Sequence, residues 1–355
     1  MLTSYYPQPP PFGQLPYPTG SSTVPIPPTP GTSSYYGGNS TGISAYVSPK
    51  NDTAAVEDIY QEIQSIMLNF LQGCRYENPT TPPDEELRHR MLLEVQSWEV
   101  ELSPKHAQCF IETGSHFAET AYRHTSPEHR FYAARYTAYF LYADDLGQHH
   151  IEALKQFPRR FMTGEPQLDP ILDRLVALVR CAHELWTDVG TDAIIIGTLE
   201  AISAFHLEFS THDMVIKPGA VRYPDYLRLR SGIDPPFIAF VFMRGWRSTA
   251  ESYLQLIPDM EYWIGAVNDV LSFYKEVKEQ ETTNYVHLRA AAERLPPLVI
   301  LRKLADEIVE TTHRLDRLVD DDVELAALWR GYVQRFLEFS VKAPRYRLAE
   351  LGLTD

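Results

Sequence analysis

Helical periodicity over most of the chain is the feature that most limits what this sequence can fold into. From about Ala54 to the end, apolar residues recur every three or four positions, which places them on one face of an α-helix. No convincing series of alternating strands with hairpin turns is present. The pattern predicts an all-α, single-domain bundle of roughly ten helices. The predicted breaks between helices lie at 78–83, 123–130, 161–170, 211–225 and 293–297.

The first 53 residues differ in composition from the rest of the chain. The first 49 contain no charged residue, and the first 50 hold 11 of the 27 prolines, mixed with Tyr, Ser, Thr and Gly. Because such a segment cannot bury a core, we expect residues 1–53 to be a disordered tail and residues 54–355 to form the folded domain. Docking to a proline-reading module is one role for the tail, and a tolerated extension is the simpler one.

Net charge and cysteine content exclude several classes of partner. A net charge of −15 at pH 7 argues against nucleic acid and anionic membrane surfaces, both of which need a basic footprint. Cys74, Cys109 and Cys181 lack the spacing of a disulfide framework or a zinc site, which fits a reducing compartment. The sequence has no run of about 18 apolar residues and no secretory signal. We therefore expect a cytoplasmic protein without integral membrane association.

The stretch NDVLSFYKE (268–276) lies on a helix predicted to run from about Ser252 to Glu279. Asn268, Ser272 and Glu276 are four residues apart and so share one face of that helix. The ordinary interpretation is the solvated side of an amphipathic helix. The alternative is a set of three oxygen ligands for a hard cation such as magnesium.

A second unusual stretch is TAYFLYADDLGQHH (137–150), at the end of a helix predicted to start at Ser126 with Pro127 as its first residue. Gly147 is expected just past the end of this helix. Asp144 and Asp145 would then repel each other and the negative end of the helix dipole. A bound cation would remove the conflict, although a polar helix end is the simpler interpretation.

Two further stretches carry arginine residues. In YLRLRSGIDPPF (226–237) we expect a helix to reach Ser231 and Gly232 and to break or kink where it meets Pro235 and Pro236. Arg228 lies one turn before Gly232. PRYRL (344–348) places Arg345 and Tyr346 near the C-terminus. These arginines are either surface charges or, with Lys275, a cationic anchor for phosphate, because a guanidinium offers a planar fork to phosphate oxygens.

Taken together, ADDLGQ, YLRLRSG, NDVLSFYKE and RYRL resemble the motifs of class I terpene cyclases, specifically the trichodiene synthase family of fungal sesquiterpene cyclases. The resemblance runs from about Ala54 to the C-terminus, and its most specific part is NDVLSFYKE. It implies a helical bundle around a hydrophobic active-site cavity. It also implies cyclisation of farnesyl diphosphate with about three magnesium ions per active site and release of diphosphate. Members of the family are often homodimers.

The resemblance also implies a role for each matching residue. Asp144 would bind magnesium, and Asn268, Ser272 and Glu276 would chelate a further ion. Arg228, Lys275, Arg345 and Tyr346 would hold the diphosphate, and Ser231 and Gly232 would be the linker and effector positions that follow the diphosphate-sensing arginine. The sequence departs from the family at Gln148, where a second acid is common. Two alternatives remain: a prenyl-chain-elongating synthase, which typically has two aspartate-rich motifs, and a catalytically silent helical scaffold.

The carbocation chemistry that the resemblance implies needs a dry pocket with aromatic faces. Aromatic residues make up 12% of the chain. An aromatic residue at helical spacing is more often part of an ordinary core, so no single one is assigned. The candidate wall residues are Phe131, Tyr139, Tyr142, Phe205, Phe240, Trp263, Tyr332 and Phe339.

Overall fold

The computed structural model describes residues 53–147 and 149–354, and within them the fold is all-α, as predicted. Residues 1–52 of the predicted tail and Gln148 lie outside the described residues, and Thr53 is the first residue of α1. No β-strand occurs in the described part, where only an isolated bridge joins Trp186 and Met243. The α-helices found there are α1 (Thr53–Gly73), α2 (Glu85–Gln96), α3 (Pro104–Ala121), α4 (Pro127–Gly147), α5 (Ile151–Thr163), α6 (Pro170–Arg180), α7 (Asp188–Ser210), α8 (Tyr223–Ser231), α9 (Asp234–Ala239), α10 (Ile257–Lys278), α11 (Tyr285–Glu293), α12 (Pro297–Leu318) and α13 (Val323–Lys342). Short 3-10 helices are η1 (Ala182–Glu184), η2 (Ala250–Ser252), η3 (Leu254–Leu256), η4 (Pro344–Tyr346) and η5 (Leu348–Leu351).

The helices outnumber the predicted ten because several are too short to show a clear period. Helix α9 has 6 residues, and α8 and α11 have 9 each. The helix that carries NDVLSFYKE begins at Ile257 rather than Ser252, since Pro258 occupies its first turn and the preceding residues form two 3-10 turns. Helix α4 begins at Pro127 as predicted and includes Gly147, one residue further than expected.

The helix that carries Arg228 ends where it was expected to, at Ser231 and Gly232. Helix α8 ends at Ser231, and α9 starts at Asp234 with Pro235 and Pro236 in its first turn. The turn between the helices contains Ile233 at φ 61°, in the left-handed region. A β-branched residue adopts this conformation only at a cost in strain, so tertiary contacts must hold the turn in place.

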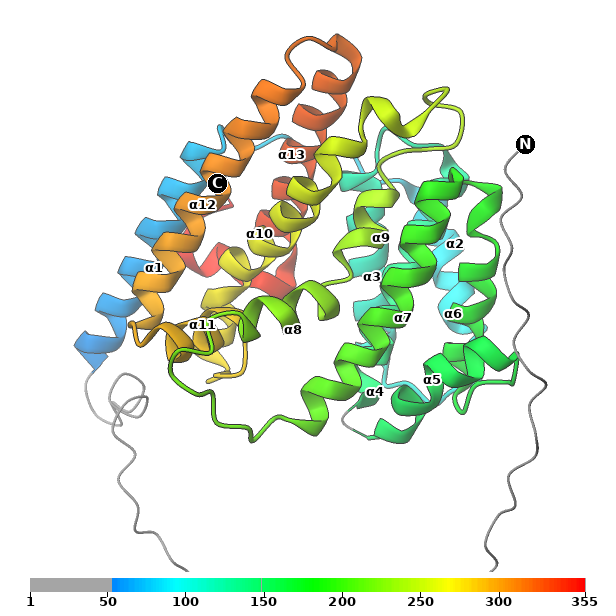
Figure 1. The fold of residues 1–355 in the computed structure, drawn as a ribbon, viewed down its shortest axis with the longest axis horizontal. Helices are drawn as coiled ribbons and strands as arrows, with labels where there is room; N and C mark the ends of the chain where they lie inside the picture. Colours follow the sequence, from blue (N-terminus) through cyan, green and yellow to red (C-terminus); the bar gives the residue numbers. More distant parts are fainter. Residues whose placement is uncertain (1–52, 148, 355) are drawn as a thin grey trace, which may run out of the picture. The chain divides into compact units, whose positions relative to one another are not determined.

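Helix α10 lies in the middle of the bundle and positions the candidate site (Figure 1). It packs against α12 and α9, and the 3-10 helix η4 near the C-terminus also contacts it. Its buried side includes Trp263, Val267 and Leu271, each fully or almost fully removed from solvent. Burying large apolar side chains along its whole length fixes the rotation of the helix, and hence the direction of its polar face.

Helix α7 is the most apolar helix of the described part. Among those residues it is the one helix long and apolar enough to cross a membrane by length and composition, with a mean hydropathy of 1.3. In the structure it packs against α5, α8 and α9. Packing inside a helical bundle selects the same composition, so these contacts account for it.

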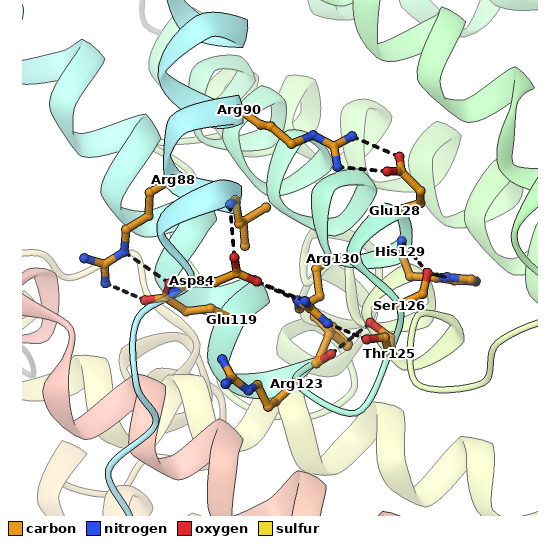
Figure 2. Close-up of polar contacts among 12 residues, drawn as sticks. Asp84, Arg88, Arg90, Glu119, Arg123, Thr125, Ser126, Glu128, His129 and Arg130 are labelled. Carbon is orange, nitrogen blue, oxygen red and sulfur yellow. Dashed lines mark hydrogen bonds and ion pairs between the residues drawn. The ribbon is translucent and has the colours of Figure 1, made fainter.

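Ion pairs tie the N-terminal end of α2 to α3 and α4 (Figure 2). Asp84 caps α2 by accepting from the Leu87 amide at 3.1 Å, and its other oxygen accepts from Arg130 at 2.9 and 3.1 Å. Glu119, which is buried on α3, accepts two N–H groups from Arg88. Burial would raise the pKa of Asp84, but the Leu87 amide and Arg130 together lower it below the ordinary value.

We expect Asp84→Asn to reduce stability by about 1 to 2 kcal/mol at pH 7, because the charged hydrogen bonds to Arg130 are weakened. A lowered folded-state pKa stabilises the protein above the unfolded-state pKa, roughly 4, and that stabilisation disappears as pH falls through the folded value. The difference in urea midpoint between variant and parent should therefore shrink below about pH 4. Glu85→Gln, an exposed neighbour, is the control. A difference that does not change with pH would show that the charge of Asp84 does not contribute.

Candidate active site

Three polar side chains of α10 present oxygen atoms without protein partners in the described structure. The Asn268 side-chain amide donates to the Tyr346 hydroxyl at 2.7 Å, which leaves the amide oxygen of Asn268 available. The Ser272 hydroxyl is buried and makes no hydrogen bond among the described residues. It lies near enough to Glu276 to favour the charged carboxylate, yet outside hydrogen-bonding geometry. Burial and the neighbouring Glu281 raise the pKa of Glu276 to about 8.

The aspartate pair sits on the last turn of α4. Asp144 is accessible to solvent, yet surrounding protein desolvates it and, with Asp145, raises the pKa of its carboxyl group. A carboxylate that is both accessible and desolvated is expected on a concave surface. Arg345 and Lys275 lie close enough to oppose this rise. The structure thus brings the end of α4 close to the predicted residues of α10 and of the C-terminal segment.

The basic residues predicted to bind diphosphate differ in their surroundings. Arg345 is exposed on η4, stacks over the Tyr346 ring at 5.6 Å, and forms no ion pair within the described residues. Lys275 is 3.8 Å from Glu279, a loose contact one turn along the helix. Tyr346 is buried, and its hydroxyl is the partner of Asn268. Arg345 therefore carries a charge that no described carboxylate neutralises directly.

Arg228 is held by carboxylates from two neighbouring helices. Its Nε donates to both oxygens of Asp269 at 2.8 and 2.9 Å, and its Nη2 donates to the Gly265 carbonyl at 2.7 Å. Its Nη1 lies 3.4 Å from Asp234. The predicted effector position, Gly232, lies against this pair: a Cβ there would meet Arg228 Nη1 at 1.9 Å. Any larger residue at that position would have to displace the guanidinium.

The predicted linker residue, Ser231, donates its hydroxyl to the Leu227 carbonyl of its own helix at 3.2 Å. That hydroxyl also lies near Glu208 on α7 and favours its charged form. Burial nevertheless raises the pKa of Glu208 to about 7, and Asp144 adds to the rise. Ser231 thus lies between Arg228 with its two carboxylate partners and the acidic groups around Asp144.

Sequence reasoning missed four acidic residues of the site: Asp234, Asp269, Glu208 and Glu281. Asp269 adjoins Asn268, but its position on the helix gives no sign that its partner is Arg228. Asp234 was visible only as the residue before two prolines. Glu281 follows α10, and its pKa is raised by burial and by Asp144 among its neighbours. For all four the signal is tertiary proximity, which a single sequence does not carry.

The donor set fits a hard divalent cation. An amide oxygen, a hydroxyl and a carboxylate at intervals of one helical turn are ligands that magnesium accepts. The buried, unpartnered Ser272 hydroxyl and the uncompensated Glu276 carboxylate would both gain from a cation between them. Across the described ranges, no group of three His, Cys, Asp or Glu residues is arranged to hold a metal. The mixed Asn, Ser and Glu set is of a different kind, since only one of its members is acidic.

Aromatic side chains line the interior between α3, α4, α9 and α13. Phe117 lies 5.0 Å from Phe237 and 4.8 Å from Phe339, measured between ring centroids, and Tyr136 lies 5.2 Å from Phe240. Of the candidate wall residues, six are buried: Tyr139, Phe205, Phe240, Trp263, Tyr332 and Phe339. The other two, Phe131 and Tyr142, are partly buried against the same core.

The helical arrangement is that of class I terpene synthases. A linalool/nerolidol synthase from Streptomyces clavuligerus matches 75% of this chain and 99% of its own, with a TM-score of 0.59 at 11% identity. A variant of the SVS_A2 protein from ancestral sequence reconstruction matches 74% of this chain and 87% of its own, with a TM-score of 0.57 at 15% identity. At this level of identity the likeness concerns the fold.

Sequence relatives define the family. Alpha-cuprenene synthase COP6 of Coprinopsis cinerea is 28% identical over 295 residues, covering 82% of this chain and 90% of that protein. Terpene synthase BipA of Cochliobolus sativus is 30% identical over 301 residues, covering 83% and 92%. Residues 88–353 match the family model for trichodiene synthase (TRI5). The chain belongs to the trichodiene synthase family and is a terpene synthase, which confirms the resemblance seen in its motifs.

Proposed function

We propose that this terpene synthase ionises farnesyl diphosphate with the help of magnesium and cyclises the resulting cation to a sesquiterpene hydrocarbon or alcohol, releasing diphosphate. The observation that carries the proposal is the set of unpartnered oxygens on Asn268, Ser272 and Glu276, next to the free charge of Arg345. The relatives COP6, an alpha-cuprenene synthase, and BipA, a terpene synthase, support a terpene product.

Each polar residue has a distinct part in this proposal. Asn268, Ser272 and Glu276 would hold one metal ion, and Asp144 would hold the others at the end of α4, about three ions in all. Bound magnesium would neutralise the charge that develops on the departing diphosphate. Arg228, Lys275 and Arg345 would bind the diphosphate oxygens directly, and the Tyr346 hydroxyl would add a hydrogen bond.

The aromatic interior would serve the hydrocarbon part of the substrate. Phe117 packs against Phe237 and Phe339 with ring centroids 5.0 and 4.8 Å away, so this part of the interior is apolar and aromatic. Aromatic faces stabilise a cation through their quadrupoles, and exclusion of water delays quenching. The polar side chains that would bind the diphosphate and the apolar interior that would hold the hydrocarbon chain therefore belong to the same site.

The two alternative functions predict different outcomes of the same assay. A chain-elongating synthase would convert farnesyl and isopentenyl diphosphates into a longer diphosphate. The second acidic run of the chain, at 320–322, is engaged elsewhere: Asp320 pairs with Arg330, and Asp322 caps α13 and pairs with Arg247. A silent scaffold would release no diphosphate at all.

A homodimer and a cytoplasmic location stay predictions. Sedimentation velocity would test the first, and a fluorescent fusion would test the second.

Purified protein incubated with farnesyl diphosphate and magnesium should give a cyclic volatile product, detected by gas chromatography with mass spectrometry, together with an equal amount of released diphosphate. Chelation of the metal should stop both, because the charge of the leaving group is no longer neutralised. Geranyl diphosphate serves as the comparison substrate for chain length. Turnover that persists in excess chelator, or a product that retains its diphosphate, would contradict the proposal.

A further inference from the structure

The carboxylate of Asp234 lies in a confined space beside Arg228. It is 4% exposed, and within the described structure its only side-chain partner is Arg228 Nη1, at 3.4 Å. Added Cβ atoms at Gly232 and Gly265 would lie 2.4 and 2.5 Å from Asp234 Oδ2. Two glycines from different elements therefore leave the space that this carboxylate occupies, and any side chain at either position would displace it.

Arg228, Asp234 and Asp269 bring one positive charge and two carboxylates together in a region with little solvent. Asp269 holds Nε of Arg228 through both oxygens at 2.8 and 2.9 Å, whereas Asp234 makes one longer contact. An unneutralised carboxylate is costly in such surroundings. Burial accordingly raises the pKa of Asp234, although Arg228 opposes the rise. Asp234 is thus the weaker and more readily released of the two partners.

We propose that Asp234 is a positioning residue for Arg228. Without substrate, the Asp234 carboxylate orients the Nη1 side of the guanidinium. When diphosphate binds, one of its oxygens replaces the carboxylate as the partner of Nη1. Asp269 and the Gly265 carbonyl keep the rest of the guanidinium fixed. The inference rests on the proposed function, since it needs a diphosphate at Arg228. Asp234 would then weaken diphosphate binding and hasten diphosphate release.

The test is Asp234→Asn, which keeps the shape of the side chain and removes its charge. Inorganic diphosphate with magnesium should bind roughly threefold to tenfold more tightly by calorimetry, as expected for loss of one like charge a few ångströms away. With farnesyl diphosphate, kcat and KM should fall together by similar factors, because diphosphate leaves more slowly. The melting temperature should not decrease, since an excess buried negative charge has been removed.

Glu119→Gln is the matched control. Glu119 is 2% exposed and accepts two N–H groups from Arg88 on the α2 side of the bundle, so the variant also neutralises a buried carboxylate held by arginine. It should lower the melting temperature and leave diphosphate affinity and KM unchanged.

Three results would overturn the inference. A lower melting temperature for Asp234→Asn with unchanged diphosphate affinity would make Asp234 a purely structural residue. Weaker diphosphate binding by the same variant would show that Asp234 supports the bound state instead of competing with it. Failure of the parent protein to bind diphosphate and magnesium would overturn the proposed function as well, which distinguishes the two.

Discussion

Glu276→Ala should reduce turnover of farnesyl diphosphate by about a hundredfold or more, the usual effect of losing a group that stabilises the charge of the leaving group. Glu276 supplies the only formal negative charge among the three α10 ligands, and it lies on a rigid, buried helix that cannot move a substitute into place. Asp144→Ala should cost a similar factor. Steady-state kinetics with released diphosphate as the readout would measure both.

A control on the same helix separates the site from general destabilisation. Asp259 lies at the other end of α10 and accepts two N–H groups from Arg314 at 2.8 Å. Asp259→Ala should lower stability slightly and leave turnover close to that of the parent. Raising the magnesium concentration should partly restore the turnover of Asp144→Asn, because weakened metal binding is offset by mass action. Normal turnover in Glu276→Ala would show that Asn268, Ser272 and Glu276 do not hold a metal ion needed for the reaction.

Arg345→Ala should cost about two orders of magnitude in turnover with almost no change in melting temperature. Arg345 forms no ion pair within the described residues, so its removal leaves no described carboxylate without a partner. Arg345→Lys should recover only part of the loss, since an ammonium cannot reproduce the planar fork of a guanidinium. Circular dichroism melts and kinetics on the same preparations would provide both readouts.

Arg347 is the matched control for this effect. It is two residues away on the same segment, but its Nε donates to Glu350 at 2.7 Å, so its charge is already neutralised. Arg347→Ala should therefore leave turnover largely unchanged. An equal loss in both variants would mean that overall positive potential matters, and that Arg345 does not bind the diphosphate.

What could be predicted from the sequence depended on local spacing. The face shared by Asn268, Ser272 and Glu276 follows from helical geometry alone, and the start of α4 follows from Pro127. The contacts of Arg228 could not be predicted in this way. They join α8, α9 and α10 over sequence separations of 6 to 41 residues, and they depend on how the chain turns at Ile233. The start of α10 was misplaced for a related reason, because 3-10 turns continue an apolar pattern without continuing the α-helix.

The crowding of carboxyl groups around the site affects the stability of the folded protein. Burial raises the pKa of Glu208 to about 7 and that of Glu276 to about 8, and Glu281 and Asp144 add to the repulsion. Such an arrangement lowers the stability of the empty protein, as functional sites often do. A cation bound among these carboxyl groups would offset their repulsion, so the folded protein should melt at a higher temperature with magnesium than without it.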